Sequence, residues 1–270
     1  MPAHNLLDNS DFRNPVNQRG KNTYNNTGNE YTIDRWKTQY GTNISIENGY
    51  INIFGDWELY QIIQNPKDGI YTFAVRIRIN SVGQYQPVIY VNDGSGTGNE
   101  CLLDANIGEW KTYILQHNLS STTGETITFA LAPRGGNGTG SISVEWAAMY
   151  KGAYDASTLP AYQPKGYAAE LAECMRYYKT MGFPAIPCAN NPAGTQVYGF
   201  LPFRMRIDNP TVSCDTLYFF KGDTTFCSVS SASAASYGTG TRIVFTLSQS
   251  VEGNLAGTVA GNGITLNADF

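Results

Sequence analysis

The sequence contains only two histidines, His4 and His117, and this scarcity restricts the catalysis that it can support. Nucleophilic catalysis of the Ser-His-Asp or Cys-His kind places a histidine beside the nucleophile. No Gly-x-Ser-x-Gly motif occurs, and neither histidine stands in a recognisable catalytic pattern. We therefore interpret His4 as a terminal residue and His117 as a loop residue, and we expect a protein without enzymatic activity.

Basic residues and long apolar runs are also scarce. Lys and Arg number 18 against 22 Asp and Glu, so the net charge of −4 argues against a nucleic-acid partner. No apolar run approaches the roughly 18 residues that a membrane-spanning helix requires. The start, MPAHNLLDNSDF, lacks the basic and apolar regions of a signal peptide. We expect a protein made in the cytoplasm that does not insert into a membrane.

Paired cysteines are missing as well. The chain has five cysteines, an odd number, and no Cys-x-x-Cys pair. This pattern supports neither a disulfide framework nor a zinc site. We expect free thiols or small buried apolar side chains in a protein that folds in a reducing compartment. The five are Cys101, Cys174, Cys188, Cys214 and Cys227.

The sequence is rich in glycine and aromatic residues, and its first half alternates apolar and polar residues with a period of two. This period is typical of antiparallel strands with one buried face. Asn48-Gly49 predicts a hairpin with a type I′ turn. We predict a mainly β protein whose residues 1–155 form a β-sandwich jelly roll. One strand at 70–80 would bury Tyr71, Phe73, Val75, Ile77 and Ile79, and another at 141–150 would bury Ile142, Val144, Trp146, Ala148 and Tyr150.

The pattern changes after residue 155. Residues 156–182 read as a proline-containing linker followed by one helix at 168–181, whose apolar stripe includes Leu171, Met175 and Tyr178. We predict that this stripe forms a junction between domains or between chains. Strand patterns return from residue 183 and predict a small antiparallel β domain over 183–270, with a weakly patterned tail from Gly253.

The glycine-rich segments do not resemble phosphate-binding motifs. Residues 94–98 and 135–140 lack the lysine of a phosphate loop and the strand-to-helix context of a dinucleotide site, so we interpret them as loops. Residues 92–100 are rich in oxygen ligands and could hold a structural calcium ion, although their spacing does not match an EF-hand. No other cofactor is expected.

Tryptophan supplies the best candidate for a binding site. Trp36, Trp110 and Trp146 read as core residues, whereas Trp57 stands among polar neighbours, after Asp56 and before Tyr60. A flat ring on a rigid sheet can stack on a sugar while nearby polar groups bind its hydroxyls. The alternative is a structural role for Trp57. In the second domain Tyr198, Tyr218 and Tyr237, with Phe200 and Phe220, are equally plausible contacts.

Asp56 and Glu58 also raise the alternative of a glycoside hydrolase, since such enzymes use two carboxylates about 5–10 Å apart. Alternation places both acids on one face of one strand, and nothing in the sequence separates their roles. We therefore favour binding over hydrolysis.

Several landmarks in order resemble a family of phage and prophage tail-fibre proteins. They are NLLDNSDF, YTIDRW, LYQII, GEWKTY, SVEWAAMYKGAY, YAAELAECMRYYKTMG and LPFRMRIDNPTV. The resemblance implies a jelly roll similar to carbohydrate-binding modules, then a connecting helix and a fibre-head-like domain. It further implies a homotrimer in the virion tail that contacts host surface glycans and other tail proteins. Two alternatives stay open: a carbohydrate-binding module of a cell-surface or polysaccharide-degrading system, and a depolymerase tailspike.

Overall fold

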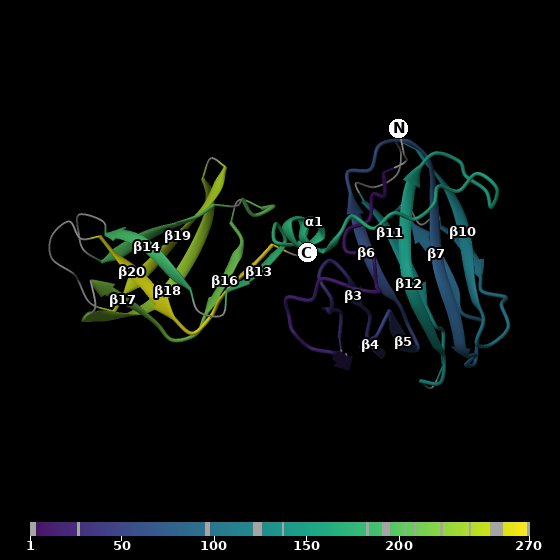
Figure 1. Ribbon diagram of the computed structural model, residues 1–270, viewed down its shortest axis with the longest axis horizontal. Helices are drawn as coiled ribbons and strands as arrows, with labels where there is room; N and C mark the ends of the chain where they lie inside the picture. Colours follow the sequence, from purple (N-terminus) through teal and green to yellow (C-terminus); the bar gives the residue numbers. More distant parts are fainter. Residues whose placement is uncertain are drawn as a thin grey trace. The chain divides into compact units, whose positions relative to one another are not determined.

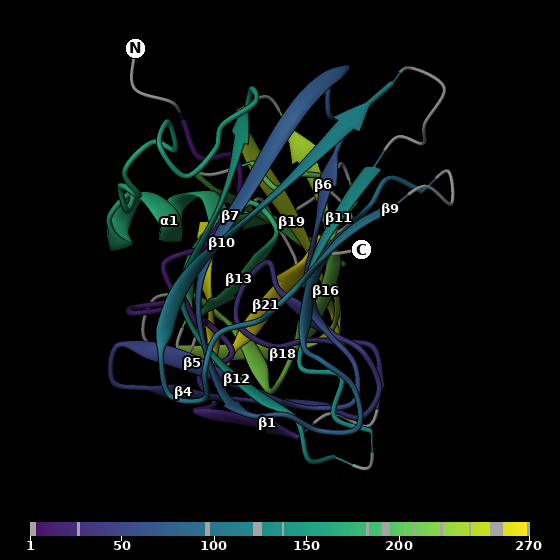
Figure 2. The same ribbon diagram turned by 90° about the vertical axis from the view of Figure 1, so that its right-hand side faces the viewer.

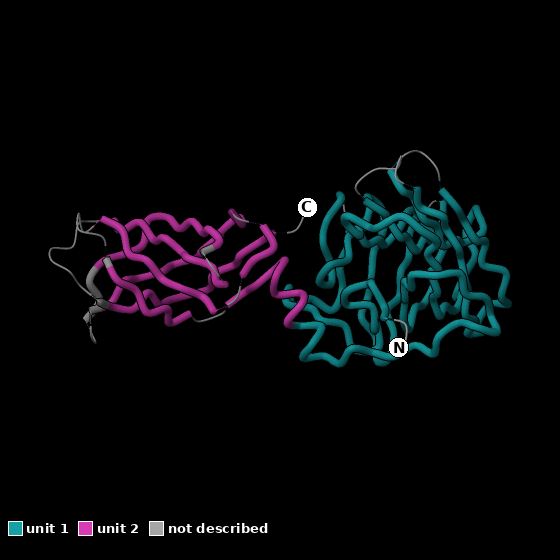
Figure 3. Tube along the Cα trace, turned by 90° about the horizontal axis from the view of Figure 1, so that it is seen from above, with its two compact units in different colours: residues 1–171 teal, residues 172–270 magenta. Residues whose placement is uncertain are grey.

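The computed structural model divides the chain into two compact units, residues 1–171 and 172–270 (Figure 3). The boundary between them falls inside a helix, after the predicted domain limit at residue 155 and before the one at 183. The structure describes residues 4–25, 28–94, 98–120, 126–136, 138–181, 184–190, 195–202, 204–207, 209–221, 224–237, 239–248 and 256–268.

The N-terminal unit is a β-sandwich of the jelly-roll type, as the alternation predicted. Both of its sheets are antiparallel and have six strands (Figures 1 and 2). Sheet A runs, in spatial order, through β1 (Thr23–Asn25), β4 (Thr42–Glu47), β5 (Tyr50–Gly55), β12 (Ser141–Lys151), β7 (Gly69–Ser81) and β10 (Trp110–Leu119). Sheet B runs through β2 (Glu30–Tyr31), β3 (Lys37–Thr38), β6 (Leu59–Gln64), β11 (Thr126–Ala132), β8 (Val88–Asn92) and β9 (Gly98–Leu102).

The core of the sandwich lies between the two sheets. The five residues predicted to point inward from 70–80 are all buried. Phe73 of sheet A stacks on Phe129 of sheet B with ring centroids 5.0 Å apart. Burying each large apolar side chain contributes about 1.5–3 kcal/mol, so this core fixes the alternation along every strand that crosses it.

A β-bulge in β12 overturns the prediction for Trp146. The pairing of β12 with β7 shifts between Val144 and Trp146, where Glu145 is the extra residue. After the bulge, Ala147 and Met149 enter the core. Trp146 therefore stands on the outer face, where it stacks on Tyr162 at 4.6 Å. One inserted residue reverses the two faces of a strand, and the composition of the segment does not reveal it.

The other two tryptophans predicted in the core differ from each other. Trp36 is fully buried and its ring packs edge-on against Phe12, with centroids 5.0 Å apart. Trp110 begins β10 on the outer face of sheet A and is only half-buried, so its assignment to the core was wrong. The predicted hairpin at Asn48-Gly49 joins β4 and β5. Only Gly49 has a positive φ there, at 92°, so the turn is not type I′, which requires two positive φ angles.

The helix α1 (Tyr167–Cys174) is shorter than the predicted helix at 168–181. The residues after it form a turn, and Tyr178 begins a strand that pairs with residues near the C-terminus. The backbone carbonyls of Arg176 and Tyr177 accept hydrogen bonds from distant segments. Arg206 N donates to Arg176 O at 2.7 Å, and Ala268 N donates to Tyr177 O at 2.6 Å. Pairing between strands thus outweighs local helix propensity. Leu171, Met175 and Tyr178 lie in a helix, a turn and a strand, and they do not form one helical stripe.

The C-terminal unit is an antiparallel β domain in two parts. A three-stranded sheet contains β13 (Tyr178–Met181), β21 (Ile264–Asn267) and β16 (Thr211–Cys214). Six further strands close into a barrel in the order β14 (Ala185–Asn190), β15 (Gln196–Leu201), β19 (Gly240–Leu247), β18 (Thr224–Tyr237), β17 (Leu217–Lys221) and β20 (Ala256–Gly261). Phe219, Phe245 and Val259 are fully buried inside it.

The last two strands, β20 and β21, come from the tail that the sequence left weakly patterned. Gly257 explains part of this weakness, because a Cβ on it would lie 2.5 Å from the ring of Phe219. Glycine is therefore required where an alternation pattern would show an apolar residue. The five cysteines are free, as predicted. Within the described ranges, no helix is long and apolar enough to cross a membrane.

Candidate functional site

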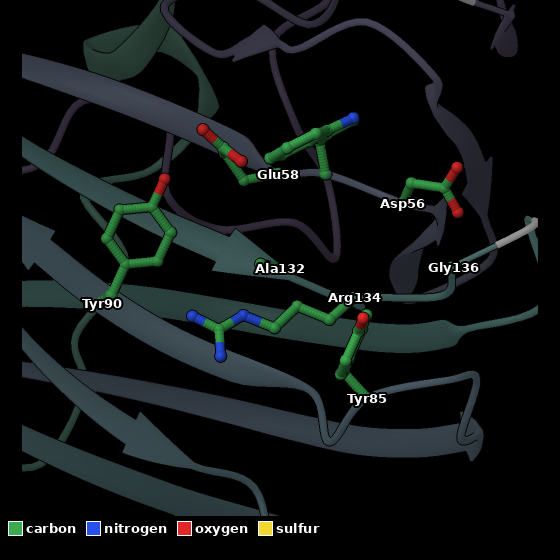
Figure 4. A pocket seen from close by; sticks show the side chains of 8 residues that line it. Asp56, Glu58, Tyr85, Tyr90, Ala132, Arg134 and Gly136 are labelled. Carbon is green, nitrogen blue, oxygen red and sulfur yellow. The ribbon is translucent and has the colours of Figure 1, made fainter.

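A cavity of about 560 Å³ lies on the N-terminal unit where three connections between strands meet (Figure 4). Tyr90 on β8 alternates with buried Ile89 and Val91, so the cavity opens on the face of sheet B that is turned away from the core. We call this space the Trp57 cavity. Its lining residues are Asp56, Trp57, Glu58, Tyr85, Tyr90, Ala132, Arg134 and Gly136.

Four glycines hold the three connections together beneath the Trp57 cavity. Gly55 ends β5, Gly83 lies between β7 and β8, and Gly135 and Gly140 lie between β11 and β12. A Cβ on Gly83 would lie 2.0 Å from Gly135 O, and a Cβ on Gly135 would lie 2.5 Å from Gly55 O. Gly135 N donates to Gly55 O at 2.8 Å, and Gly55 N donates to Gly140 O at 3.1 Å. Only glycine permits backbones to approach so closely.

The backbone of Trp57 and the side chain of Asp56 are held by hydrogen bonds to neighbouring segments. Trp57 N donates to Thr42 Oγ1 at 3.1 Å, and Asp56 Oδ1 accepts from Gly138 N at 2.8 Å. The side chain of Trp57 is nevertheless 53 % exposed. An exposed ring on a backbone that is held in place loses little conformational freedom when a ligand covers it.

Glu58 lies deeper, with only 6 % of its surface exposed. The hydroxyl of Tyr90 donates a hydrogen bond to its carboxylate, and Figure 4 shows the two groups facing each other. Burial raises the pKa of Glu58, and the bond from Tyr90 and the charge of Arg134 offset part of that rise. Burial, followed by the charge of Glu58, also raises the pKa of Tyr90, which therefore stays protonated and keeps donating.

Arg134 is the basic residue of the cavity, and its guanidinium extends between Tyr85 and Tyr90 in Figure 4. Its Nη2 donates to Glu100 Oε2 at 2.8 Å. Its φ of 49° lies in the left-handed region, where side chains other than glycine are uncommon. The neighbouring glycine cluster holds this strained backbone, and such strain is often found at functional sites.

A second cavity of about 300 Å³ adjoins the first and shares Tyr90 and Arg134 with it. Its other lining residues are Val91, Asn92, Gly98, Asn99 and Glu100. Asn99 Nδ2 donates to Gln116 O at 2.8 Å, which orients the amide. The two cavities together place aromatic rings at one end of the site and amides at the other.

The structure brings together only part of the residue set that the sequence suggested. Asp56 and Trp57 line the Trp57 cavity, whereas Tyr60 stands on β6 outside its lining. Burial raises the pKa of Tyr60 to about 12, with a smaller contribution from the charge of Glu58. Sequence reasoning missed Tyr85, Tyr90 and Arg134 as cavity residues. The alternation in 88–92 could have placed Tyr90 on an outer face, but nothing in the sequence brings that face to Trp57.

Two of the tyrosines suggested in the second domain, Tyr198 and Tyr218, lie on the outside of the barrel. Tyr198 on β15 is half-buried beneath Arg242, whose Cζ is 5.7 Å from the ring centroid. Tyr218 on β17 is 38 % exposed and contacts Phe220 edge-on at 6.4 Å. Tyr237 ends β18, and its side chain lies outside the described residues.

Neither histidine lines the Trp57 cavity, and no described residue of the proposed calcium loop does. His117 lies within β10 and not in a loop, so that interpretation was wrong; the strand continues to Leu119. It is buried, with Nε2 3.1 Å from Asp93 Oδ2. Residues 95–97 of the suggested calcium loop lie outside the described residues. In the part of the chain that is described, no group of three or more His, Cys, Asp or Glu could hold a metal ion.

Comparisons with known proteins reveal similarity only to solved structures. No protein-family model matches the chain, and no curated protein matches it. A CBM4 carbohydrate-binding module is 16 % identical and covers 54 % of this chain and 99 % of its own, with a TM-score of 0.35. A CBM61 module in complex with β-1,4-galactotriose is 16 % identical and covers 56 % of this chain and 100 % of its own, with a TM-score of 0.34. The CBM22-1 xylan-binding domain of Paenibacillus barcinonensis Xyn10C is 13 % identical and covers 57 % of this chain and 99 % of its own, with a TM-score of 0.36. Likeness at this level leaves the ligand to be argued from the residues of the cavity.

Proposed function

We propose that the Trp57 cavity binds a saccharide. The observation that carries this proposal is the half-exposed ring of Trp57, held on a fixed backbone beside Tyr85 and Tyr90. Aromatic faces pack against the apolar faces of sugar rings, while a few polar groups fix the hydroxyls. Asp56 and Glu58 supply hydrogen-bond acceptors, and Arg134 supplies donors.

The dimensions of the site fit reversible binding of part of a glycan. Ligand cavities typically occupy about 300–1,000 Å³, and the Trp57 cavity is about 560 Å³. The adjoining cavity extends the surface past Tyr90 and Arg134 to the amides of Asn92 and Asn99. A chain of two or more sugar units is therefore long enough to occupy both cavities and to contact the guanidinium of Arg134, which lines both.

The proposal includes binding without catalysis. Hydrolysis requires one carboxyl group to act as acid and a second to act as base or nucleophile across the scissile bond. Here Asp56 accepts from the backbone of Gly138, and Glu58 accepts from Tyr90, so both acids support the walls of the cavity. Release of reducing sugar from a host-envelope polysaccharide, lost in both Asp56→Asn and Glu58→Gln, would contradict this part of the proposal.

The biological setting is proposed from the sequence landmarks alone. Their order supports a phage or prophage tail-fibre protein that contacts host surface glycans as a homotrimer on the virion. Three weak sites on one particle would strengthen attachment through avidity. Light scattering of the purified chain at micromolar concentration should give the mass of a trimer, and a stable monomer would contradict the fibre setting without affecting the saccharide site.

The test of saccharide binding is a glycan array with the intact chain and its Trp57→Ala variant. We expect the variant to lose binding at least tenfold, since stacking on the ring is removed, while its melting temperature stays unchanged. Trp110→Ala is the matched control, because Trp110 lies on the outer face of sheet A. Equal binding by the Trp57→Ala variant, or loss of binding in both variants, would reject the site.

A further inference from the structure

The charges around the two cavities do not balance. Their linings include three acids, Asp56, Glu58 and Glu100, and one basic residue, Arg134. Arg134 already forms an ion pair with Glu100 at 2.8 Å. Arg134 is therefore shared between Glu100, with which it forms an ion pair, and Glu58, whose pKa its charge lowers, so the described lining holds three acids for one basic residue.

The two carboxylates differ in how strongly they need a cation. Asp56 is half-buried and receives a backbone hydrogen bond from Gly138. Glu58 is 6 % exposed, and its carboxylate accepts a hydrogen bond from the hydroxyl of Tyr90. A buried carboxylate is costly unless it is paired, so a positively charged group entering the cavity would gain more from Glu58 than from an exposed acid. Burial raises the pKa of Glu58, and the hydrogen bond from Tyr90 and the charge of Arg134 offset only part of that rise, so a further cation beside this carboxylate would favour its charged form.

The aromatic residues strengthen the same preference. Trp57, Tyr85 and Tyr90 line the cavity together with these acids. The face of an aromatic ring attracts a cation through its quadrupole, most strongly for tryptophan. A cavity lined by both carboxylates and aromatic rings is therefore suited to an ammonium group, and it disfavours a carboxylate or a phosphate.

Resting on the proposed function, we propose that the Trp57 cavity prefers saccharides that carry a free, protonated amine over saccharides in which that amine is acetylated and over saccharides that carry a carboxylate. Glu58 is the residue that determines this selectivity, and Trp57 supplies the stacking surface that all bound sugars share.

Affinity electrophoresis of the full chain in gels containing chitosan, soluble glycol chitin or polygalacturonate tests the preference. We expect retention by chitosan at a concentration about tenfold lower than by glycol chitin, and no retention by polygalacturonate. Because the chain has a net charge of −4, chitosan also attracts its surface in general. The preference therefore counts only if Glu58→Gln removes it and Glu47→Gln, which changes an exposed acid on β4, does not.

The outcomes separate the two proposals. Equal or weaker retention by chitosan than by glycol chitin, no retention by chitosan, or a preference that survives Glu58→Gln overturns the amine selectivity. The saccharide site would still stand if binding on the glycan array depended on Trp57. Loss of Trp57 dependence on the array overturns the site itself, whatever the three polymers show.

Discussion

Trp110 on the outer face of sheet A and Trp57 beside the outer face of sheet B have opposite surroundings. On sheet A, the Cζ of Arg78 lies 5.0 Å from the ring centroids of both Trp110 and Tyr50. Those two rings also meet each other edge-on at 5.9 Å. On sheet B, the ring of Trp57 is 53 % exposed above a cavity.

The polar groups beneath the two rings differ in the same way. On sheet A, Ser143 is buried and donates to Asn52 at 2.6 Å, while Asn80 donates to Ser143 at 2.9 Å. Arg78 completes this network by donating to Asn80 at 3.1 Å. On sheet B, two acids face a cavity with one arginine that is already paired. A surface tryptophan is therefore a better candidate for ligand binding where its neighbours leave the ring uncovered and the acids around it outnumber the basic residues.

The largest effect should come from adding a side chain to the four glycines, Gly55, Gly83, Gly135 and Gly140, that hold the connections of the Trp57 cavity together. Sheet A has no such cluster beneath Trp110 among the contacts described above. A Gly83→Ala Cβ would collide with the backbone oxygen of Gly135, so the connections that carry Tyr85 and Arg134 must move apart. We expect about 3 kcal/mol of lost stability in urea unfolding, together with loss of glycan binding. Gly28→Ala is the control, because its new Cβ meets nothing closer than 3.9 Å. An unchanged unfolding midpoint for Gly83→Ala would show that the cluster does not support the site.

A smaller effect should distinguish the two tryptophans. Trp110→Ala removes the ring that covers Arg78, and we expect it to destabilise the sandwich by about 1–2 kcal/mol while leaving saccharide binding intact. Trp57→Ala should change stability by less than about 0.5 kcal/mol. Urea unfolding of both variants measures the difference. If Trp57→Ala loses more stability than Trp110→Ala, then Trp57 is the structural ring and the contrast drawn between the two faces is wrong.

Much of the fold could be predicted because burial imposes the same period on many strands. Tyr71, Phe73 and Val75 alternate in the sequence and in the structure, since a one-residue slip would expose a whole face. The prediction that Trp146 is buried in the core was wrong, because a bulge at Glu145 shifts the register of β12 without changing the composition of the segment. The second half of the predicted helix was wrong because Tyr178–Met181 pairs with Ile264–Asn267, a contact far along the chain.

The candidate site was less predictable because it is assembled from three separate connections. Trp57 stood out by its polar neighbours, and the structure places it in the cavity lining. Tyr85 and Arg134 join it only because Gly83, Gly135 and Gly55 allow their backbones to pack against one another. Each of those glycines reads as an ordinary loop residue in the sequence. Local pattern therefore identifies one wall of the cavity, and long-range backbone contact supplies the others.

The smallest effect should be a pH-dependent change in stability that comes from the buried carboxylate of Glu58. The acid compared with it on sheet A is Glu145, which is half-exposed and forms an ion pair with Arg76 at 2.7 Å. Burial raises the pKa of folded Glu58, so in the window between its unfolded and folded pKa the folded chain holds more protons than the unfolded chain. Its contribution to stability therefore falls as the pH rises through that window. Glu58→Gln should be more stable than the parent above the window, and the difference should vanish below it.

Urea unfolding of both proteins between pH 4 and pH 8 measures this difference, with Glu47→Gln as the exposed control. A Glu58→Gln variant that is less stable than the parent at pH 8 would contradict the burial cost assigned to this carboxylate. If the variant gains stability and also loses its preference for chitosan, the chain keeps Glu58 charged and buried at a cost in folding free energy. That combination would tie the buried charge of Glu58 to ligand selectivity, in contrast to Glu145 of sheet A, which is paired with Arg76.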